Sequence, residues 1–121
     1  MHAKNAKGVA DALRAAEHEK ELGNKAFARR DRAQAVARYI EAIECLRDAA
    51  AQKPANAEES KIKTTMAVCR ANRAAAWLLP GAGRDPRKAL DDAEEAIAQD
   101  PGYGKGCVLS VQRAIWRDVR V

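Results

Sequence analysis

The chain has 121 residues, of which 47% are hydrophobic but only 4% aromatic, and its 22 Lys and Arg against 17 Asp and Glu give a formal net charge of +5. This length provides one domain with one modest core, and no apolar stretch reaches the roughly 20 residues that a membrane-spanning helix needs. Cys45, Cys69 and Cys107 are odd in number and widely spaced, which excludes a dense disulfide framework and favours a reducing compartment. We therefore expect a cytoplasmic protein.

Two helices are predicted in the first half of the chain. After a flexible N-terminus over residues 1–8, helical spacing of apolar side chains predicts a first helix over about 9–30. Asp31 is a good N-cap for a second helix over about 32–52, which Pro54 ends. The two apolar stripes comprise Val9, Leu13, Ala16, Leu22, Ala26 and Phe27 in the first helix, and Val36, Tyr39, Ile40, Ile43 and Leu46 in the second.

Three further helices are predicted in the second half. A third helix over about 57–79, with Asn56 as its candidate cap, ends at Pro80-Gly81-Ala82-Gly83. Asp85 followed by Pro86 starts a fourth helix over about 86–99, and Asp100-Pro101-Gly102 is predicted to be a turn before a fifth helix over about 103–118. Short connections between helices predict an all-α fold of antiparallel hairpins, the first over about 9–52 and the second over about 57–99, followed by an unpaired fifth helix.

Small and aromatic residues recur in the two hairpins in similar positions. They are Leu22, Gly23, Ala35 and Tyr39 in the first hairpin, and Ala74, Trp77, Ala89, Ala96 and Pro101 in and after the second. From about residue 18 to 118 the chain resembles the tetratricopeptide-repeat family, although Ala35 and Ala89 lie 54 residues apart where the family period is about 34. The resemblance implies that residues 9–121 form a short right-handed solenoid, shortened at its C-terminal end.

More narrowly, the chain resembles the carboxylate-clamp branch of that family, found in co-chaperones and large immunophilins. Those domains bind the acidic Glu-Glu-Val-Asp tail of heat shock protein 70 or heat shock protein 90. The resemblance rests on Lys20 and Asn24 four residues apart, on Asn72 in an Asn-Arg-Ala-Ala segment, and on Lys105 in a Tyr-Gly-Lys-Gly segment. Leu109 stands where the family has arginine, and Arg113, one turn further on, is a candidate partial substitute.

These residue types suit the binding of a chain-terminal acid. Side chains four apart lie on one face of a helix, lysine provides a mobile positive charge, and asparagine provides neutral amide donors. The simpler interpretation of each residue is a solvated lysine or a locally bonded asparagine. For Trp77, core packing is favoured over ligand stacking.

Three other functions can be weighed from the sequence. A self-associating scaffold with a degraded clamp would use the apolar stripe Val108, Val111, Ile115 and Val119 of the unpaired fifth helix. Nucleic-acid binding would rest on charge alone, because no stacking aromatic lies in a basic cluster of the sequence. An enzyme is disfavoured, since no nucleophile–base pair or phosphate loop is evident and His2 and His18 are isolated. We expect no catalytic residue, metal or cofactor.

Overall fold

The structure, a computed structural model, describes residues 8–119, with side chains described as far as Ile115. The described chain is helical, in the order α1 (Val9–Ala28), α2 (Arg32–Ala51), α3 (Asn56–Trp77), α4 (Pro86–Gln99) and α5 (Pro101–Val119). The predicted all-α fold is confirmed, and the predicted helix positions differ from these bounds by two residues or fewer. Of the predicted flexible stretch 1–8, only Gly8 lies within the described residues.

Acidic side chains start two of the helices as the sequence predicts. Asp31 accepts a hydrogen bond from the Gln34 backbone N–H at 3.1 Å, and Asp85 accepts one from the Lys88 N–H at 3.0 Å. These bonds satisfy backbone donors that have no partner within the helix. The prediction for α3 was wrong: Asn56 is the first helical residue rather than the cap. There the Glu58 carboxylate instead accepts from the Ala55 N–H at 3.2 Å.

The predicted turn over Asp100-Pro101-Gly102 was also wrong, because α5 begins at Pro101. The Gly104 N–H already donates to the Asp100 carbonyl at 2.8 Å, so the chain changes direction at a single residue. Such a sharp reversal brings α4 and α5 very close together. A Cβ added at Gly104 would lie 2.4 Å from the backbone of Ile97, closer than any two such atoms can approach.

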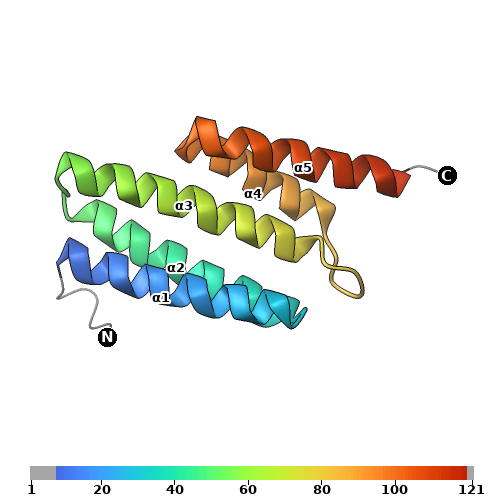
Figure 1. Cartoon of the computed structure of the whole chain (residues 1–121), viewed down its shortest axis with the longest axis horizontal. Helices are drawn as coiled ribbons and strands as arrows, with labels where there is room; N and C mark the ends of the chain where they lie inside the picture. The colour runs from blue at the N-terminus through green and yellow to red at the C-terminus, as the bar shows by residue number, and fades with distance from the viewer. Residues whose placement is uncertain (1–7, 120–121) are drawn as a thin grey trace.

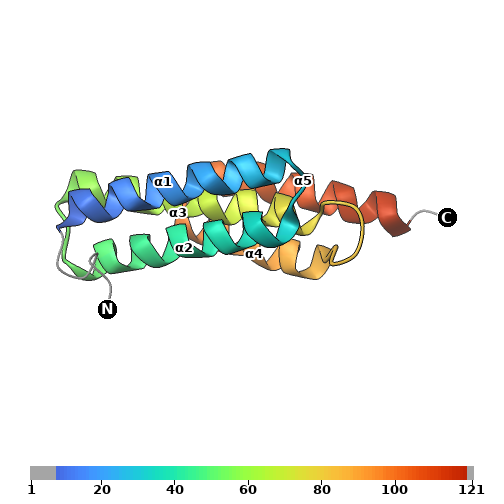
Figure 2. The ribbon, with the colours of Figure 1, turned by 90° about the horizontal axis from the view of Figure 1, so that it is seen from below.

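The helices lie in two layers. Figure 1 shows consecutive helices running in opposite directions, and Figure 2, turned by 90°, shows α1, α3 and α5 on one side and α2 and α4 on the other. Within this arrangement α2 packs against both α1 and α3, and α4 packs against both α3 and α5. Three helices from distant parts of the sequence therefore share one face of the molecule. Within the described residues no helix is long and apolar enough to span a membrane.

Small side chains fill the places where helices cross. Most of the residues with no exposed surface are alanines, namely Ala12, Ala16, Ala35, Ala42, Ala49, Ala67, Ala74, Ala76, Ala89, Ala93 and Ala96. Larger apolar side chains such as Leu46 and Ile62 fill the space between α1, α2 and α3, and Trp77 packs against the cluster of α3, α4 and α5. Interiors are packed to the density of organic crystals, so these alanines set the distances between helices.

The apolar stripe predicted for α5 mostly faces the protein interior. Val111 is buried, and Val108 and Ile115 are partly buried against α3 and α4. Val119 lies outside the described side chains. Among the α5 side chains up to Ile115, the exposed large apolar residues are instead Tyr103 and Leu109.

Replacing Gly104 with alanine tests the close approach of α4 and α5. The added methyl would collide with backbone, so we expect a loss of about 1–3 kcal/mol in the free energy of unfolding. Gly106→Ala is the matched control, because nothing lies within 4 Å of a Cβ there and alanine favours the helix. Urea unfolding of both variants is the measurement, and equal stability of the two would contradict the crossing geometry.

Candidate functional site

Two hollows open along the face that α1, α3 and α5 share. The smaller, of about 130 Å³, lies between α1, α2 and α3, and the larger, of about 430 Å³, lies between α3 and α5. Asn72 lines both, so the hollows adjoin across α3, and together we call them the polar groove. The other lining residues are Asn24, Phe27, Tyr39 and Ala75 in the smaller hollow, and Ala71, Tyr103, Gly106, Cys107 and Ser110 in the larger.

A hydrogen-bonded network forms the floor of the smaller hollow. The Tyr39 hydroxyl donates to Asn24 Oδ1 at 2.6 Å, and Asn72 Nδ2 donates to the same oxygen at 3.1 Å. Two donors that converge on one amide oxygen fix the orientation of that amide. The Asn24 NH₂ group therefore faces away from both partners, where it can donate to another molecule.

Tyr39 is held in place by the close approach of α1 and α2. Its ring is 1% exposed and lies against Gly23, where an added Cβ would be 2.6 Å from Tyr39 Cε1. Burial, helped by the negative charges of a Cys69 thiolate and of Glu21, raises the pKa of Tyr39 to about 12. The hydroxyl consequently stays protonated and acts as a fixed donor toward Asn24.

Lys20 lies one turn before Asn24 on α1 and faces the other two helices of its layer. Its side chain is 19% exposed, and its Nζ lies 3.1 Å from Glu17 Oε1. Burial raises the pKa of the Cys69 thiol on α3 to about 12, and the positive charge of Lys20 partly opposes that rise. Burial likewise raises the pKa of Tyr103 on α5, again opposed by Lys20. The lysine charge thus acts on side chains of both α3 and α5.

The predicted cations of α5 are placed differently from one another. The side of α5 that lines the larger hollow carries Tyr103, Gly106, Cys107 and Ser110. Lys105 is exposed and is two residues from both Tyr103 and Cys107, so it points to a different side of the helix. Arg113 is exposed and three residues after Ser110, so it shares the side that lines the groove.

The arginine that follows Asn72 is turned toward α4. Arg73 Nε donates to Asp92 Oδ2 at 2.8 Å and its Nη2 donates to Oδ1 at 2.5 Å. Asp92 is buried, and paired bonds between a guanidinium and a carboxylate are strong and geometrically specific. This pair fixes the rotation of α3 about its axis and thereby keeps Asn72 on the groove face.

The structure brings together some of the predicted residues and adds one that sequence reasoning did not assign to the site. Asn24 and Asn72 are in contact, and Lys20 lies on the same face of the molecule. Tyr39 was predicted only as a core residue, because its partner Asn24 is on another helix and no local spacing reveals their contact. Within the described part of the chain, no three His, Cys, Asp or Glu side chains are grouped so as to hold a metal ion.

Comparison of the chain with protein-family models, with curated proteins and with solved structures found no match.

The buried acid groups predict a loss of stability at alkaline pH. Cys69 and Tyr39 have pKa values of about 12 in the folded chain against ordinary values of 9.0 and 10.0, so the unfolded chain releases these protons first. Their contribution to the free energy of unfolding is complete below pH 9 and is lost as the pH rises toward 12. Urea unfolding across this range is the measurement.

Cys69→Ala and Tyr39→Phe separate the two contributions, because each removes one titrating group. We expect each variant to lose less stability than the unmodified protein between pH 9 and 12. The same loss in the unmodified protein and in both variants would contradict the assignment.

Proposed function

We propose that the chain is a protein–protein interaction module of the tetratricopeptide-repeat, carboxylate-clamp type, which binds the acidic C-terminal peptide of a partner. The observation that carries the proposal is the 3.1 Å contact between Asn24 and Asn72, which are 48 residues apart and lie on different helices. Both are residues on which the resemblance to the clamp family rests. A chance similarity of sequence would not require them to meet.

The groove provides the chemistry that a terminal carboxylate requires. Lys20 supplies positive charge from α1, and the Asn24 NH₂ group is directed outward because Tyr39 and Asn72 occupy its oxygen. Hydrogen bonds to a charged acceptor are roughly twice as strong as neutral ones. The larger hollow, walled by Tyr103 and Cys107, is suited to an apolar side chain of the bound peptide. The tails of heat shock protein 70 and heat shock protein 90 combine these features.

The third helix of the layer contributes less charge than the family pattern calls for. Leu109 is 59% exposed at the position where arginine is expected, and Lys105 points to another side of α5. Arg113 is therefore the α5 cation that the helix geometry directs toward the groove. Binding through two asparagines, Lys20 and Arg113 would be weaker than binding through a complete clamp.

Titration with the peptide Met-Glu-Glu-Val-Asp tests the proposal. We expect the free acid to bind and the C-terminal amide to bind about tenfold more weakly or not at all. Asn72→Ala removes a donor beside a charged ligand and should weaken binding by about 10- to 100-fold. Asn56→Ala, at the exposed start of the same helix, is the matched control and should leave the affinity unchanged. Calorimetry that shows equal affinity for acid and amide would refute the proposal.

Replacing Leu109 with arginine tests the placement of the α5 side chains. Leu109 lies one turn after Lys105 and, like Lys105, is two residues from Cys107, so helix geometry directs it away from the side that lines the groove. We therefore expect Leu109→Arg to bind the peptide with the same affinity as Leu109→Gln, although the clamp family has arginine at this position. Calorimetry that shows tighter binding by the arginine variant would contradict this placement.

A self-associating scaffold is the second candidate, and the exposure of Leu109 and Tyr103 on α5 favours it. Two apolar side chains on one helix offer a surface for a second copy of the chain. Sedimentation of the unmodified protein and of Leu109→Gln over a range of concentrations is the measurement. A scaffold forms a concentration-dependent dimer that the substitution abolishes. A monomer at every concentration contradicts self-association.

A further inference from the structure

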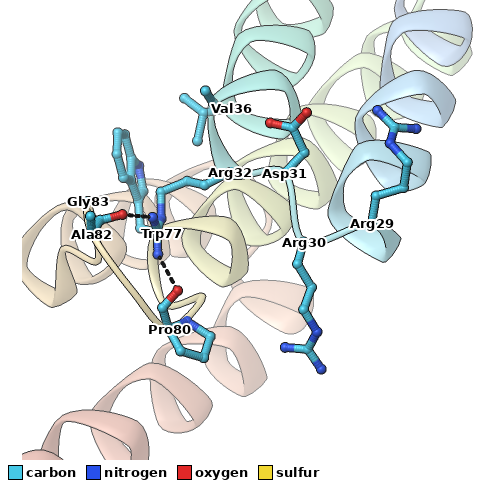
Figure 3. A pocket seen from close by; sticks show the side chains of 10 residues that line it. Arg29, Arg30, Asp31, Arg32, Val36, Trp77, Pro80, Ala82 and Gly83 are labelled. Carbon is cyan, nitrogen blue, oxygen red and sulfur yellow. Dashed lines mark hydrogen bonds between the residues drawn. The ribbon is translucent and has the colours of Figure 1, made fainter.

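A second, larger cleft lies at the other end of the first hairpin from the start of α1. It has a volume of about 790 Å³ and forms where the turn between α1 and α2 meets the loop between α3 and α4 (Figure 3). We call it the basic cleft, because three arginines line it against a single acid. Its lining comprises Arg29, Arg30, Asp31, Arg32, Ala33, Val36, Trp77, Pro80, Ala82 and Gly83.

Arg32 builds the cleft and has its donors occupied by the neighbouring loop. Its Nε donates to the Ala76 carbonyl at 3.1 Å, and its Nη2 donates to the Pro80 carbonyl at 3.3 Å. Further bonds run to the carbonyls of Leu79 and Ala82. These carbonyls lie in the last turn of α3, at Ala76, and in the loop that follows it, where helical partners run out and other donors are needed. Arg32 therefore joins the two hairpins, while its charge remains at the cleft.

Arg29 and Arg30 are exposed and project from the cleft rim. Figure 3 shows their guanidinium groups pointing in clearly different directions, one on each side of the turn. Asp31, the acid of the cleft, already accepts the Gln34 N–H as the cap of α2. Two divergent cations cannot converge on one small anion, but they can contact charges that are spaced along an extended ligand.

The backbone at Arg30 is one in which glycine is normally found. Its φ is +60°. The Asp31 N–H donates to the Ala26 carbonyl at 2.9 Å, and the Arg30 N–H donates to the Phe27 carbonyl at 2.8 Å. This pair of bonds is typical of a helix that ends at a residue in the left-handed conformation. A side chain is disfavoured in that conformation. The sequence nevertheless has arginine there, which keeps an exposed cation at the rim of the cleft.

An aromatic ring lies in the same cleft. Trp77 is partly buried at the end of α3 and contributes to the lining, and Lys88 Nζ lies 4.7 Å from the centre of its ring. The sequence has no aromatic residue within this basic cluster, and the fold adds one to it. Trp77 is 45 residues or more from the three arginines in sequence, and only the folded chain brings them together.

From these observations we infer that the basic cleft binds single-stranded nucleic acid, a function separate from peptide binding in the polar groove. The diverging Arg29 and Arg30 contact separate phosphates of the strand, and a base stacks on the face of the Trp77 indole that Lys88 does not cover. Stacking on an aromatic ring beside a cationic track is how proteins bind single strands without sequence preference. An acidic peptide offers charge to the arginines but no ring to the indole.

Fluorescence anisotropy with a dye-labelled oligothymidylate of about ten nucleotides tests the inference on the full chain. The logarithm of the binding constant should fall linearly with the logarithm of the salt concentration. Removal of one phosphate contact should reduce the steepness of that line by about 0.7. We expect that reduction for Arg29→Gln and for Arg30→Gly, and the latter should fold normally since glycine suits its backbone. Asn72→Ala, in the polar groove, should bind the oligonucleotide unchanged.

Lys53→Gly is the matched control. Lys53 has a φ of +53° and lies in the connection between α2 and α3, at the opposite end of the helices from the cleft (Figure 1). Lys53→Gly therefore removes one positive charge from the same type of backbone as Arg30→Gly does. The slope of its affinity against salt concentration should equal that of the unmodified protein. Equal losses for Lys53→Gly and Arg30→Gly would show binding to net charge alone and would overturn the inference. Polyglutamate of matched charge that competes as well as unlabelled oligothymidylate would overturn it as well.

Discussion

The close approach of neighbouring helices is the constraint on which the rest of this structure depends. Alanine fills the crossings between layers, and glycine is required where α1 meets the Tyr39 ring and where α5 meets the backbone of Ile97. With helices this near, a polar side chain on one can reach the next. The contact between Asn24 and Asn72, and with it the polar groove, follows directly from that spacing.

Polar groups in the interior then fix how each helix is rotated. The ion pair of Arg73 and Asp92 turns one side of α3 toward α4, and the preceding residue, Asn72, then faces the groove. Arg32 performs a comparable role at the ends of the hairpins by donating to carbonyls in the last turn of α3 and in the loop after it. Buried charges and amides are costly unless they are paired, so these contacts select one arrangement among the many that a sequence rich in alanine could adopt.

The two candidate sites differ in how their charge is presented. The polar groove presents neutral amide donors whose orientation is fixed, with a single lysine, one-fifth exposed, one turn away on α1. The basic cleft has exposed arginines on a turn, backed by a part-buried indole. A compact ligand with one terminal acid fits the first, and an extended polyanion with flat rings fits the second. Placed on different parts of one small helical domain, the sites could be occupied at the same time.

The sequence by itself determined the helices, because their signals are local. Asp31, Pro54, Pro80, Asp85 and Pro86 act within a turn of their own positions, and apolar spacing reports which face of each helix is buried. The errors of the sequence-based prediction were local too. The Glu58 carboxylate, and not Asn56, accepts the backbone N–H at the start of α3. The helix α5 begins as early as Pro101, because Gly104 permits the close crossing with α4.

Only the tertiary structure decided which distant side chains meet. Tyr39 became part of the polar groove, Lys105 turned away from the side of α5 that lines it, and Trp77 joined the three arginines of the basic cleft. No spacing along the chain encodes these contacts, because they depend on how the packed helices are rotated and how far apart they lie. Both quantities are set by the side-chain volumes of the whole core.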